Sequence, residues 1–538
     1  MTIEPSPDVN QKATIQNSYD AIPYVIEAQY ETHPDRLATP ARLFGLSPAP
    51  VERCRVLELG CASGGNLLPM AYSLPGSEFV GIDLSPRQVQ TGQQYIGYLG
   101  LKNITMRCED ILDFPADAGE FDYIIAHGVF SWVPEVVRQK ILEIYARHLA
   151  PHGVGYISYN VLPGWSLLSA LRTMLLYHSR NEQEGNARLE KSLEWLDFLS
   201  KYTDSTIKEY NPHLRAVIDS IKKQAEGANA RRYWYHEFLE TYNHPLYFSE
   251  VVERASRAGL RYMADTDISV MYPNEYPAEV AAFLKQNAAN LVEAEQYLDF
   301  LRNRPFRRSL FVHQGAPLVE TPGAAQMRHL NVNANIHPVQ PEEGAAPEPL
   351  PETFLFPDAS KLPFPNLFHR ALLSACSQSY RPVGPSGMPF EAIVQAALER
   401  LPEGTSTPED PAGEAARLLF SLHTYSSTFV EFSTWTPQVA TRASERPVAS
   451  TVARLLAAMG DTVTNLNHQR IQMDEPSRFA LWCLDGNRDR AAVVEMLLSA
   501  IQAGKLRLPE GAVVSRKALG ESLEEQLEYF ASHALLVA

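Results

Sequence analysis

The sequence predicts an α/β fold with a parallel sheet in the first third of the chain. Between residues 51 and 160, short β-branched runs alternate with longer amphipathic segments, which is typical of βαβ units. Small turn-forming residues follow the first run, and a serine-proline pair opens one of the amphipathic segments. At 538 residues the chain is too long for one hydrophobic core, so we expect further domains after the sheet.

The strands of this region can be predicted one after another. We expect them at residues 55–59, 78–84, 104–108, 121–126 and 154–159. Helices are expected to begin near Asn66, Ser85 and Pro134. Ser85 can cap free N–H groups, and the proline after it is tolerated in the first turn of a helix. Together these elements predict a first α/β domain over residues 51–166.

The pattern changes after residue 166. Residues 167–313 contain long helical periods such as LEKSLEWLDFLSKY, which predict a mostly helical second domain. Residues 314–365 are rich in Pro, Ala and Glu with little periodicity, which favours a linker or an extended surface segment. Residues 366–538 resume helical patterns with short β-like pieces and predict a helical or winged-helix-like module.

Composition excludes several classes of protein. No apolar stretch approaches the ~20 residues that a membrane-spanning helix needs, and the N-terminus does not resemble a signal peptide. We therefore expect a cytoplasmic protein without membrane insertion. The five cysteines are scattered, which argues against disulfides and a structural zinc site, and we expect no metal. The net charge of −16 argues against nucleic acid as a partner.

Four closely spaced arginines form the densest basic patch of the sequence, at Arg302, Arg304, Arg307 and Arg308. We interpret them as a solvated or salt-bridged face.

The loop after the first predicted strand indicates the kind of ligand. Its sequence, VLELGCASGG, has neither the G-x-G-x-x-G of a dinucleotide site nor the GK[ST] of a P-loop. It offers an acid, Glu58, just before the strand ends, and then a turn from Gly60 to Gly64. A carboxylate and close backbone contact suit a ligand with an amino acid tail and a sulfonium better than they suit a phosphate.

Acids also close the next two predicted strands. Asp83 lies about 20 residues after the glycine turn, where a carboxylate can accept both hydroxyls of an unphosphorylated ribose. Glu109 and Asp110 close the third strand, where an acid can accept the exocyclic amine of adenine and the adjacent Ile111 can pack on the ring. In register at three strand ends, these signals indicate an adenosine attached to an amino acid with no phosphate between them.

Through ELGCASGG, GIDLS and CEDI, the chain resembles the class I S-adenosylmethionine-dependent methyltransferases. The resemblance implies a Rossmann-like sheet and S-adenosylmethionine as cofactor. The alternative is a Rossmann-like domain that binds another nucleotide or no ligand. The residues that we expect to bind the cofactor are Tyr19, Glu58, Gly60, Ala62, Gly64, Asp83, Leu84, Glu109, Asp110, Ile111 and His127.

The remaining two strand ends, AHGVFSWVP and SYNVLPGW, should face the methyl acceptor. Tyr159, Asn160 and Trp165 are candidates for positioning an amine by hydrogen bonding and cation–π contact. Core packing of the two aromatics, with Asn160 capping a turn, is an equal alternative. His127 could act as a base, stack near the adenine, or simply be hydrogen-bonded within its loop.

Longer segments narrow the resemblance. HGVFSWVP, SYNVLPGW, YHEFLETYNHPLYF and LLAAMGDTVTNLNHQRIQMDEPSRFALWCLDG are similar to bacterial methyltransferases with an appended regulatory domain, which include protein-lysine methyltransferases that modify outer-membrane proteins. The resemblance implies methyl transfer to a lysine of a protein substrate, presented by the helical domain. It also implies that residues 1–50 form a helical lid, with Tyr19 over the cofactor. Phe130 stands where that family often has a tyrosine, so no acceptor contact is assigned there.

Two other functions remain open at this point. One is a small-molecule methyltransferase of a biosynthetic pathway, and the other is a non-catalytic, S-adenosylmethionine-binding regulatory protein. Large members of the resembled group suggest a possible homodimer, although no residue pattern indicates one. The residues do not determine the methyl acceptor.

Overall fold

A seven-stranded sheet lies at the centre of the protein, with strand order β3-β2-β1-β4-β5-β7-β6. The computed structural model describes residues 27–202, 211–224, 228–339, 349–380, 387–507 and 513–537. The strands are β1 (Arg55–Leu59), β2 (Glu78–Asp83), β3 (Ile104–Cys108), β4 (Phe121–Ala126), β5 (Leu149–Asn160), β6 (Leu260–Asp265) and β7 (Phe306–His313). Strands β1 to β5 are parallel, whereas β7 is antiparallel to both β5 and β6. The predicted α/β fold is confirmed.

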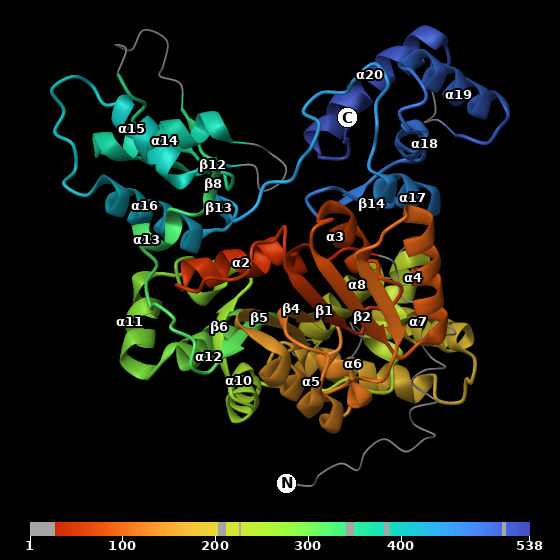
Figure 1. The fold of residues 1–538 in the computed structure, drawn as a ribbon. Coiled ribbons are helices and arrows are strands. Elements are labelled where there is room, and N and C mark those ends of the chain that lie inside the picture. The colour runs from red at the N-terminus through yellow and green to blue at the C-terminus, as the bar shows by residue number, and fades with distance from the viewer. Residues whose placement is uncertain are drawn as a thin grey trace.

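The helices between the parallel strands begin where the sequence predicts. They are α3 (Leu67–Ser73), α4 (Pro86–Leu99) and α5 (Glu135–His148). At the start of α4, the Ser85 hydroxyl accepts a hydrogen bond from the N–H of Gln88 at 3.2 Å, and Gly100 ends the helix in a left-handed conformation. These helices pack on the faces of the sheet (Figure 1). The loops that follow the parallel strands therefore lie together at the carboxyl-terminal edge of the sheet.

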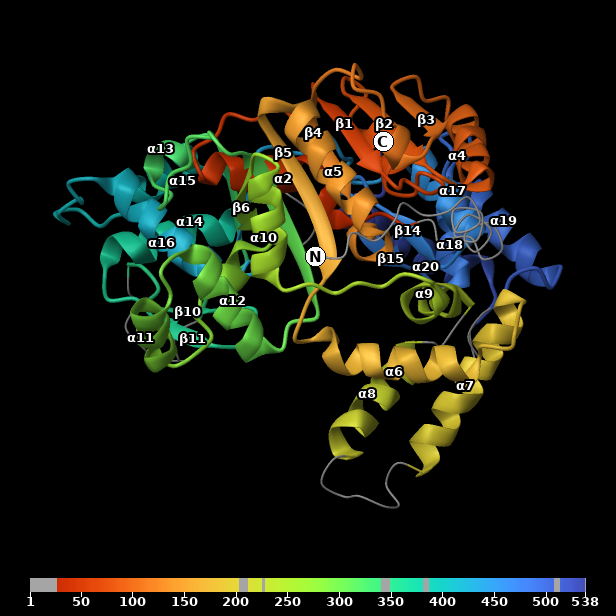
Figure 2. The same ribbon diagram turned by 90° about the horizontal axis from the view of Figure 1, so that it is seen from below.

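The predicted domain boundary at residue 166 does not coincide with the end of the sheet. Helices α6 (Trp165–His178), α7 (Gly185–Tyr202), α8 (Asn211–Gln224) and α9 (Ala228–Leu239) form an insertion with its own small core. Figure 2 shows the insertion projecting from the molecule. The chain then returns through α10 (Phe248–Arg257), β6, η4 (Ile268–Met271), α11 (Ala278–Asn287), α12 (Leu291–Arg302) and β7 to complete the sheet.

The basic patch is salt-bridged and partly buried. Arg307 of β7 is 0% exposed and pairs with Glu295 and Asp299 of α12. Arg304 pairs with Asp265, and the other two arginines pair with Glu275 and Glu31. The strand was missed because its arginines resemble a surface pattern, whereas α12 supplies the counter-charges that allow one of them to be buried.

A second lobe follows β7, and part of the predicted linker belongs to it. Strand β8 (Asn331–Ala334) pairs with β12 (Met388–Pro389) and β13 (Val430–Ser433), so residues 331–334 are not a linker. The other short strands are β9 (His337–Pro338), β10 (Thr353–Leu355) and β11 (Lys361–Pro363), and the helices are α13 (Ala324–Met327), α14 (Leu367–Ser379), α15 (Phe390–Glu399) and α16 (Pro411–Tyr425). Its apolar core is continuous with that of the sheet.

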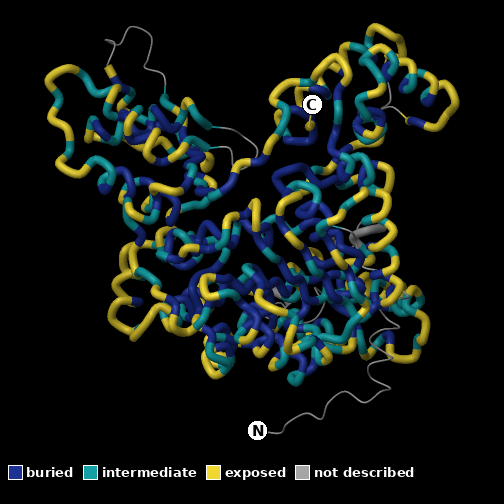
Figure 3. The backbone as a smooth tube through the Cα atoms, viewed as in Figure 1, coloured by how far each residue is buried: buried dark blue, intermediate teal, exposed yellow. Residues whose placement is uncertain are grey.

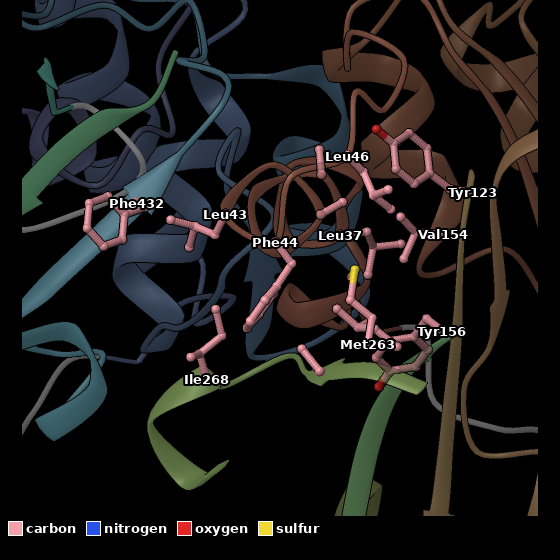
Figure 4. Close-up of a cluster of buried hydrophobic side chains, with 14 of the residues drawn as sticks. Leu37, Leu43, Phe44, Leu46, Tyr123, Val154, Tyr156, Met263, Ile268 and Phe432 are labelled. Carbon is pink, nitrogen blue, oxygen red and sulfur yellow. The ribbon is translucent and has the colours of Figure 1, made fainter. Parts of the chain in front are cut away.

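Helix α2 (Pro34–Leu43) joins this lobe to the sheet. Figure 4 shows its apolar side chains between Phe432 of β13 and the sheet residues Tyr123, Val154 and Tyr156. The N–H of Thr434 donates to the Asp35 carboxylate of α2 at 2.6 Å. The helix therefore fixes the short segment before it, residues 27–33, close to the sheet.

The C-terminal lobe has a separate core, so residues 366–538 do not form one module as predicted. It contains α17 (Thr451–Met459), the hairpin β14 (Thr462–Thr464) and β15 (Arg470–Gln472), α18 (Glu475–Cys483), α19 (Arg490–Gln502) and α20 (Arg516–Ser532). Figure 3 shows exposed chain at the outer ends of both upper lobes and buried chain at their bases. Within the described residues, no helix is both long and apolar enough to cross a membrane.

Candidate functional site

A cavity of about 1260 Å³ opens at the carboxyl-terminal edge of the sheet, where open α/β sheets bind ligands. Segments from the whole chain form its wall: residues 27–31, the loop after β1, the loops after β4 and β5, helices α8 and α9, the start of β7, and the β14–β15 hairpin. It is therefore shared by the sheet, the helical insertion and the C-terminal lobe.

Glu58 is the acid at the base of this cavity. It is 3% exposed, and the Asn66 side-chain amide donates to its Oε1 at 2.7 Å. Its other oxygen, Oε2, is buried and has no hydrogen-bond partner among the described residues. Burial raises the pKa of Glu58 to about 7, while the hydrogen bond from Asn66 opposes that rise. A cationic group at Oε2 would satisfy this oxygen and restore the charged form of the carboxyl.

The turn after β1 requires glycine at both of its ends. Gly60 has φ +77° and Gly64 has φ +78°, a conformation that costs other residues energy. A Cβ at Gly60 would lie 2.6 Å from Cγ2 of Val129, and one at Gly64 would lie 2.9 Å from Sδ of Met106. The backbone of the turn therefore lies close to its surroundings, with Gly60 and Ala62 lining the cavity.

Asp83 anchors the same turn from the end of β2. Its Oδ2 accepts from the N–H of Ala62 at 2.8 Å and its Oδ1 from the N–H of Ser85 at 2.9 Å. Asp83 does not belong to the lining of the large cavity, and neither does the half-buried Leu84. The carboxylate therefore holds the loop after β1 against the start of α4.

The acids after β3 are also bound locally. Asp110 accepts from the N–H of Leu112 at 2.9 Å and caps a short 3-10 helix that begins at the half-buried Ile111. Glu109 lies 3.4 Å from Arg107. The structure thus brings Glu58, Gly60, Ala62 and His127 into one cavity wall, whereas Gly64 and the acids at the ends of β2 and β3 do not line that cavity.

His127 lies in the wall formed by the loop after β4. Its Nδ1 is 2.9 Å from the hydroxyl oxygen of Tyr156, and the two rings stack at 5.9 Å. Burial, followed by the charges of Arg308 and Arg470, lowers the pKa of His127 to about 4. The imidazole is therefore neutral at pH 7, so it does not supply a positive charge to the site.

Of the three candidates for positioning the acceptor, Asn160 and Trp165 line the cavity. Asn160 ends β5 at 2% exposed, and its side chain donates to Oδ1 of Asn243 at 3.4 Å. Trp165 begins α6 and contacts Trp132 edge-on at 6.3 Å between ring centroids. Its buried ring fixes the direction in which α6 leaves the sheet.

The structure does not bring Tyr159 to the cavity. Strand alternation turns its side chain to the face opposite that of Asn160, where it is 1% exposed and its hydroxyl lies 2.8 Å from that of Ser309. Phe130 packs against it at 6.1 Å between ring centroids. Tyr159 is thus a core residue, and the missing hydroxyl at Phe130 does not alter the lining. Tyr19 lies outside the described residues.

Several residues of the wall were not anticipated. Asn66 accepts from the N–H of Gln29 at 2.9 Å and from Nε2 of His468 at 2.8 Å. It therefore connects the segment before the sheet and the C-terminal lobe to Glu58. Glu31, Glu237, Arg308 and Arg470 also line the cavity. Position next to the glycine turn could have suggested Asn66, but nothing in the sequence relates residues 468–470 to that turn.

Family models match three parts of the chain. They are described as a methyltransferase domain for residues 56–153, a predicted methyltransferase regulatory domain for residues 230–313, and a PKMT C-terminal winged helix domain for residues 445–535. The uncharacterized protein RP789 of Rickettsia prowazekii (strain Madrid E) is 33% identical over 98% of this chain and 96% of its own length. The chain belongs to the class I S-adenosylmethionine-dependent methyltransferases.

Two further comparisons bear on this methyltransferase. The structure of PKMT2 from Rickettsia typhi in complex with AdoHcy is 27% identical, has a TM-score of 0.80, and is matched over 96% of this chain and 100% of that chain. The uncharacterized protein sll1526 of Synechocystis sp. (strain ATCC 27184 / PCC 6803 / Kazusa) is 28% identical over 54% of this chain and 58% of its own length. The cofactor of this methyltransferase is S-adenosylmethionine.

The cavity fits this cofactor. Oε2 of Glu58 is a buried oxygen without a partner among the described residues, which suits an amino group. The backbone of the turn after β1 lines the cavity at Gly60 and Ala62, so a ligand there can contact it directly. When bound, S-adenosylmethionine supplies a methyl group on a positively charged sulfur. The protein's own residues then have to hold the acceptor in line and exclude water.

Proposed function

We propose that this methyltransferase N-methylates lysine side chains of a protein substrate. The observation that carries the proposal is the size and chemistry of the cavity. Its volume of about 1260 Å³ exceeds the roughly 300–1,000 Å³ typical of a site for one small molecule, as a site shared by the cofactor and an acceptor side chain requires. The wall carries carboxylates at Glu27, Glu31 and Glu237, the first two paired with Arg470 and Arg308, together with aromatic rings at Trp132 and Trp165.

Such a wall suits a cation on an aliphatic stem. Aromatic faces and carboxylates attract an ammonium, and the stem of a lysine packs on apolar rings. The amine must lose its proton before it attacks the methyl group, because an ammonium has no free electron pair. Partial desolvation and a neighbouring sulfonium both lower the pKa of the amine from its usual ~10.4. No dedicated base is therefore assigned.

Asn160 and Trp165 are the proposed positioning residues for the acceptor. The side-chain N–H₂ of Asn160 is directed to Asn243, so its carbonyl oxygen is the group available to accept an amine N–H. Trp165 offers an apolar ring beside it in the same wall. Orientation of the two reactants in this way is worth ~7 to 11 kcal/mol at best.

The cofactor contacts are proposed from the cavity wall and from the order of the strand ends at the edge of the sheet. Glu58, Gly60, Ala62 and Gly64 would hold the methionine part, Asp83 and Leu84 the ribose, and Glu109, Asp110 and Ile111 the adenine, with His127 beside them. The comparisons support a protein acceptor, because both the matched winged helix domain and the solved relative carry the name PKMT.

The test is transfer of a tritiated methyl group from S-adenosylmethionine in a lysate of the source cell. We expect label in protein, recovered as methylated lysine after acid hydrolysis. Asp83→Ala serves as a control with strongly weakened cofactor binding, and Asn160→Ala should bind cofactor but transfer about 100-fold more slowly. Recovery of label only in small molecules would exclude the lysine proposal and favour a biosynthetic methyltransferase.

A further inference from the structure

The C-terminal winged helix lobe forms part of the cofactor cavity. Asp461, Thr462, Arg470 and Gln472 of the β14–β15 hairpin line the cavity, as does the loop after β1. The lobe is held there by packing between α17 and α3 and by a hydrogen bond from the N–H of Thr451 to the Tyr72 hydroxyl at 3.3 Å. Figure 2 shows the hairpin and α9 on the same side of the sheet. The hairpin is thus turned toward the methyltransferase domain.

The turn between β14 and β15 contacts the loop after β1 through a hydrogen bond between His468 and Asn66. Nε2 of His468 lies 2.8 Å from Oδ1 of Asn66. The same oxygen accepts from the N–H of Gln29 at 2.9 Å and from the Thr32 hydroxyl at 3.0 Å, while Nδ2 donates to Oε1 of Glu58 at 2.7 Å. The backbone N–H of Gln29 can only donate, so its contact fixes which atom of Asn66 is Oδ1, and Nε2 of His468 must be the donor to that oxygen.

His468 is held rigidly for this contact. It is 2% exposed and has φ +63°, which is uncommon for a residue other than glycine. Asn465 sets the turn, since its Oδ1 accepts from the N–H groups of Asn467 at 3.0 Å and Gln469 at 2.8 Å. Nδ1 of His468 is buried without a partner among the described residues, so the side chain is the neutral tautomer that carries its proton on Nε2. Strain at such a position is typical of functional sites.

We infer that His468 is a positioning residue of the cofactor site. Its Nε2–H holds the Asn66 amide, the amide holds Oε1 of Glu58, and Oε2 is left directed to the amino group of the cofactor's methionine part. The winged helix lobe thus serves as a wall of the methyltransferase site. This inference does not depend on the identity of the methyl acceptor, because it concerns the cofactor alone.

The test measures binding of S-adenosylhomocysteine to the full-length protein by isothermal titration calorimetry. His468→Ala removes the donor, and we expect about 5- to 20-fold weaker binding, because the Asn66 carbonyl loses one of its partners. His468→Gln places an amide N–H near the same position and should restore binding to within about threefold of the wild type. Thermal melting of each variant confirms that it is folded at the assay temperature.

A double-mutant cycle separates positioning from general stability. Asn66→Ala should weaken binding by itself, and His468→Ala should then weaken it no further, since the connection to Glu58 is already lost. Gln469→Ala is the matched control, because it removes the side chain that accepts from Asn465 in the same turn. It should lower the melting temperature without changing the affinity for S-adenosylhomocysteine.

Three results would overturn the inference. One is an unchanged affinity in a folded His468→Ala variant. Another is independent, multiplicative losses in the double variant, which would mean that the two side chains do not act through each other. The third is a loss in Gln469→Ala equal to that in His468→Ala, which would mean that only the stability of the hairpin matters.

Discussion

The loop after β1 and the loops after β2 and β3 close the same sheet at the same edge, but they are anchored in different ways. Asn66, in the loop after β1, is bonded by residues 29 and 32 before the sheet and by His468 near the end of the chain. Asp83 and Asp110 accept N–H groups from neighbouring loops and from their own helix start. The proposed methionine end of the site is therefore assembled by distant segments, whereas the proposed adenosine end is local.

The two ends also differ in how their carboxylates are bonded before the ligand binds. Oε2 of Glu58 is a buried acceptor without a partner among the described residues, and Oε1 is already fixed by Asn66. The carboxylates of Asp83 and Asp110 instead have backbone donors that support the loops. A preformed and unsatisfied group costs folding stability and favours a ligand that completes it.

Asp83 bonds the loop after β1 and is also the acceptor proposed for the ribose. Its replacement is therefore expected to have the largest effect on cofactor affinity. In Asp83→Ala, the Ala62 N–H loses its acceptor, and the ribose hydroxyls lose the acceptor proposed for them. Affinity for S-adenosylhomocysteine should fall about 100-fold or more, since two supports of the ligand are removed at once. Calorimetry checks this, and binding that stays within threefold of the wild type would contradict the assignment of both ends.

The parallel strands and the ligand class were predictable, because both follow from local patterns. Alternating β-branched runs gave β1, β3 and β4 at their observed bounds, and the acids after β1, β2 and β3 lie at one edge because parallel strands end together. The turn glycines were predictable because a positive φ favours glycine. These features need only neighbouring residues to explain them.

The parts that the sequence did not predict depend on distant partners. Strand β7 was concealed by Arg307, whose burial is possible only because α12 supplies two carboxylates. Tyr159 was expected at the acceptor, but the register of β5 against β7 directs its hydroxyl to Ser309. His468 lies 402 positions from Asn66, and no local pattern relates the two. Long-range packing, unlike a turn or a cap, leaves no signal at either position.

Titration of Glu58 should make ligand binding at the proposed methionine end depend on pH. Because burial raises the pKa of Glu58 to about 7, the free protein holds a proton there below pH 7, and a cationic amino group must displace it. Affinity for S-adenosylhomocysteine should therefore rise up to ~10-fold from pH 6 to pH 8 and level off above that. The same carboxyl contributes stability at low pH that is lost as the pH rises from about 4.5 to 7.

Glu58→Gln is the control for this pH dependence. The variant keeps the shape of the side chain but cannot titrate, so the slope between pH 6 and pH 8 should nearly vanish. Glu237 also lines the cavity, and burial raises its pKa to about 7, so Glu237→Gln measures its share. A full slope in Glu58→Gln would assign the titration to another group and contradict the proposed role of Oε2.

A smaller effect is expected at the adenosine end. Asp110→Ala removes the acceptor proposed for adenine and also the cap on the N–H of Leu112. Loss of the cap costs about 1 kcal/mol of stability, and binding should weaken about 3- to 10-fold. Asp110→Asn retains the cap and separates the two contributions. If Asp110→Ala weakened binding more than Asp83→Ala, the adenosine end would carry the larger share of affinity.

The ion pair between Arg470 and Glu27 should matter least, although it joins the same two segments that meet at Asn66. Its atoms are 2.5 Å apart, but the side chains are 51% and 26% exposed, and exposed pairs contribute about 0–1 kcal/mol. Arg470→Gln should therefore change the affinity for S-adenosylhomocysteine less than about threefold, and the change should shrink as salt screens the pair. The difference from His468→Ala, two residues away in the same hairpin, is the informative quantity. If Arg470→Gln instead weakened binding as much as His468→Ala at high salt, the hairpin would act by its general placement and not through Asn66.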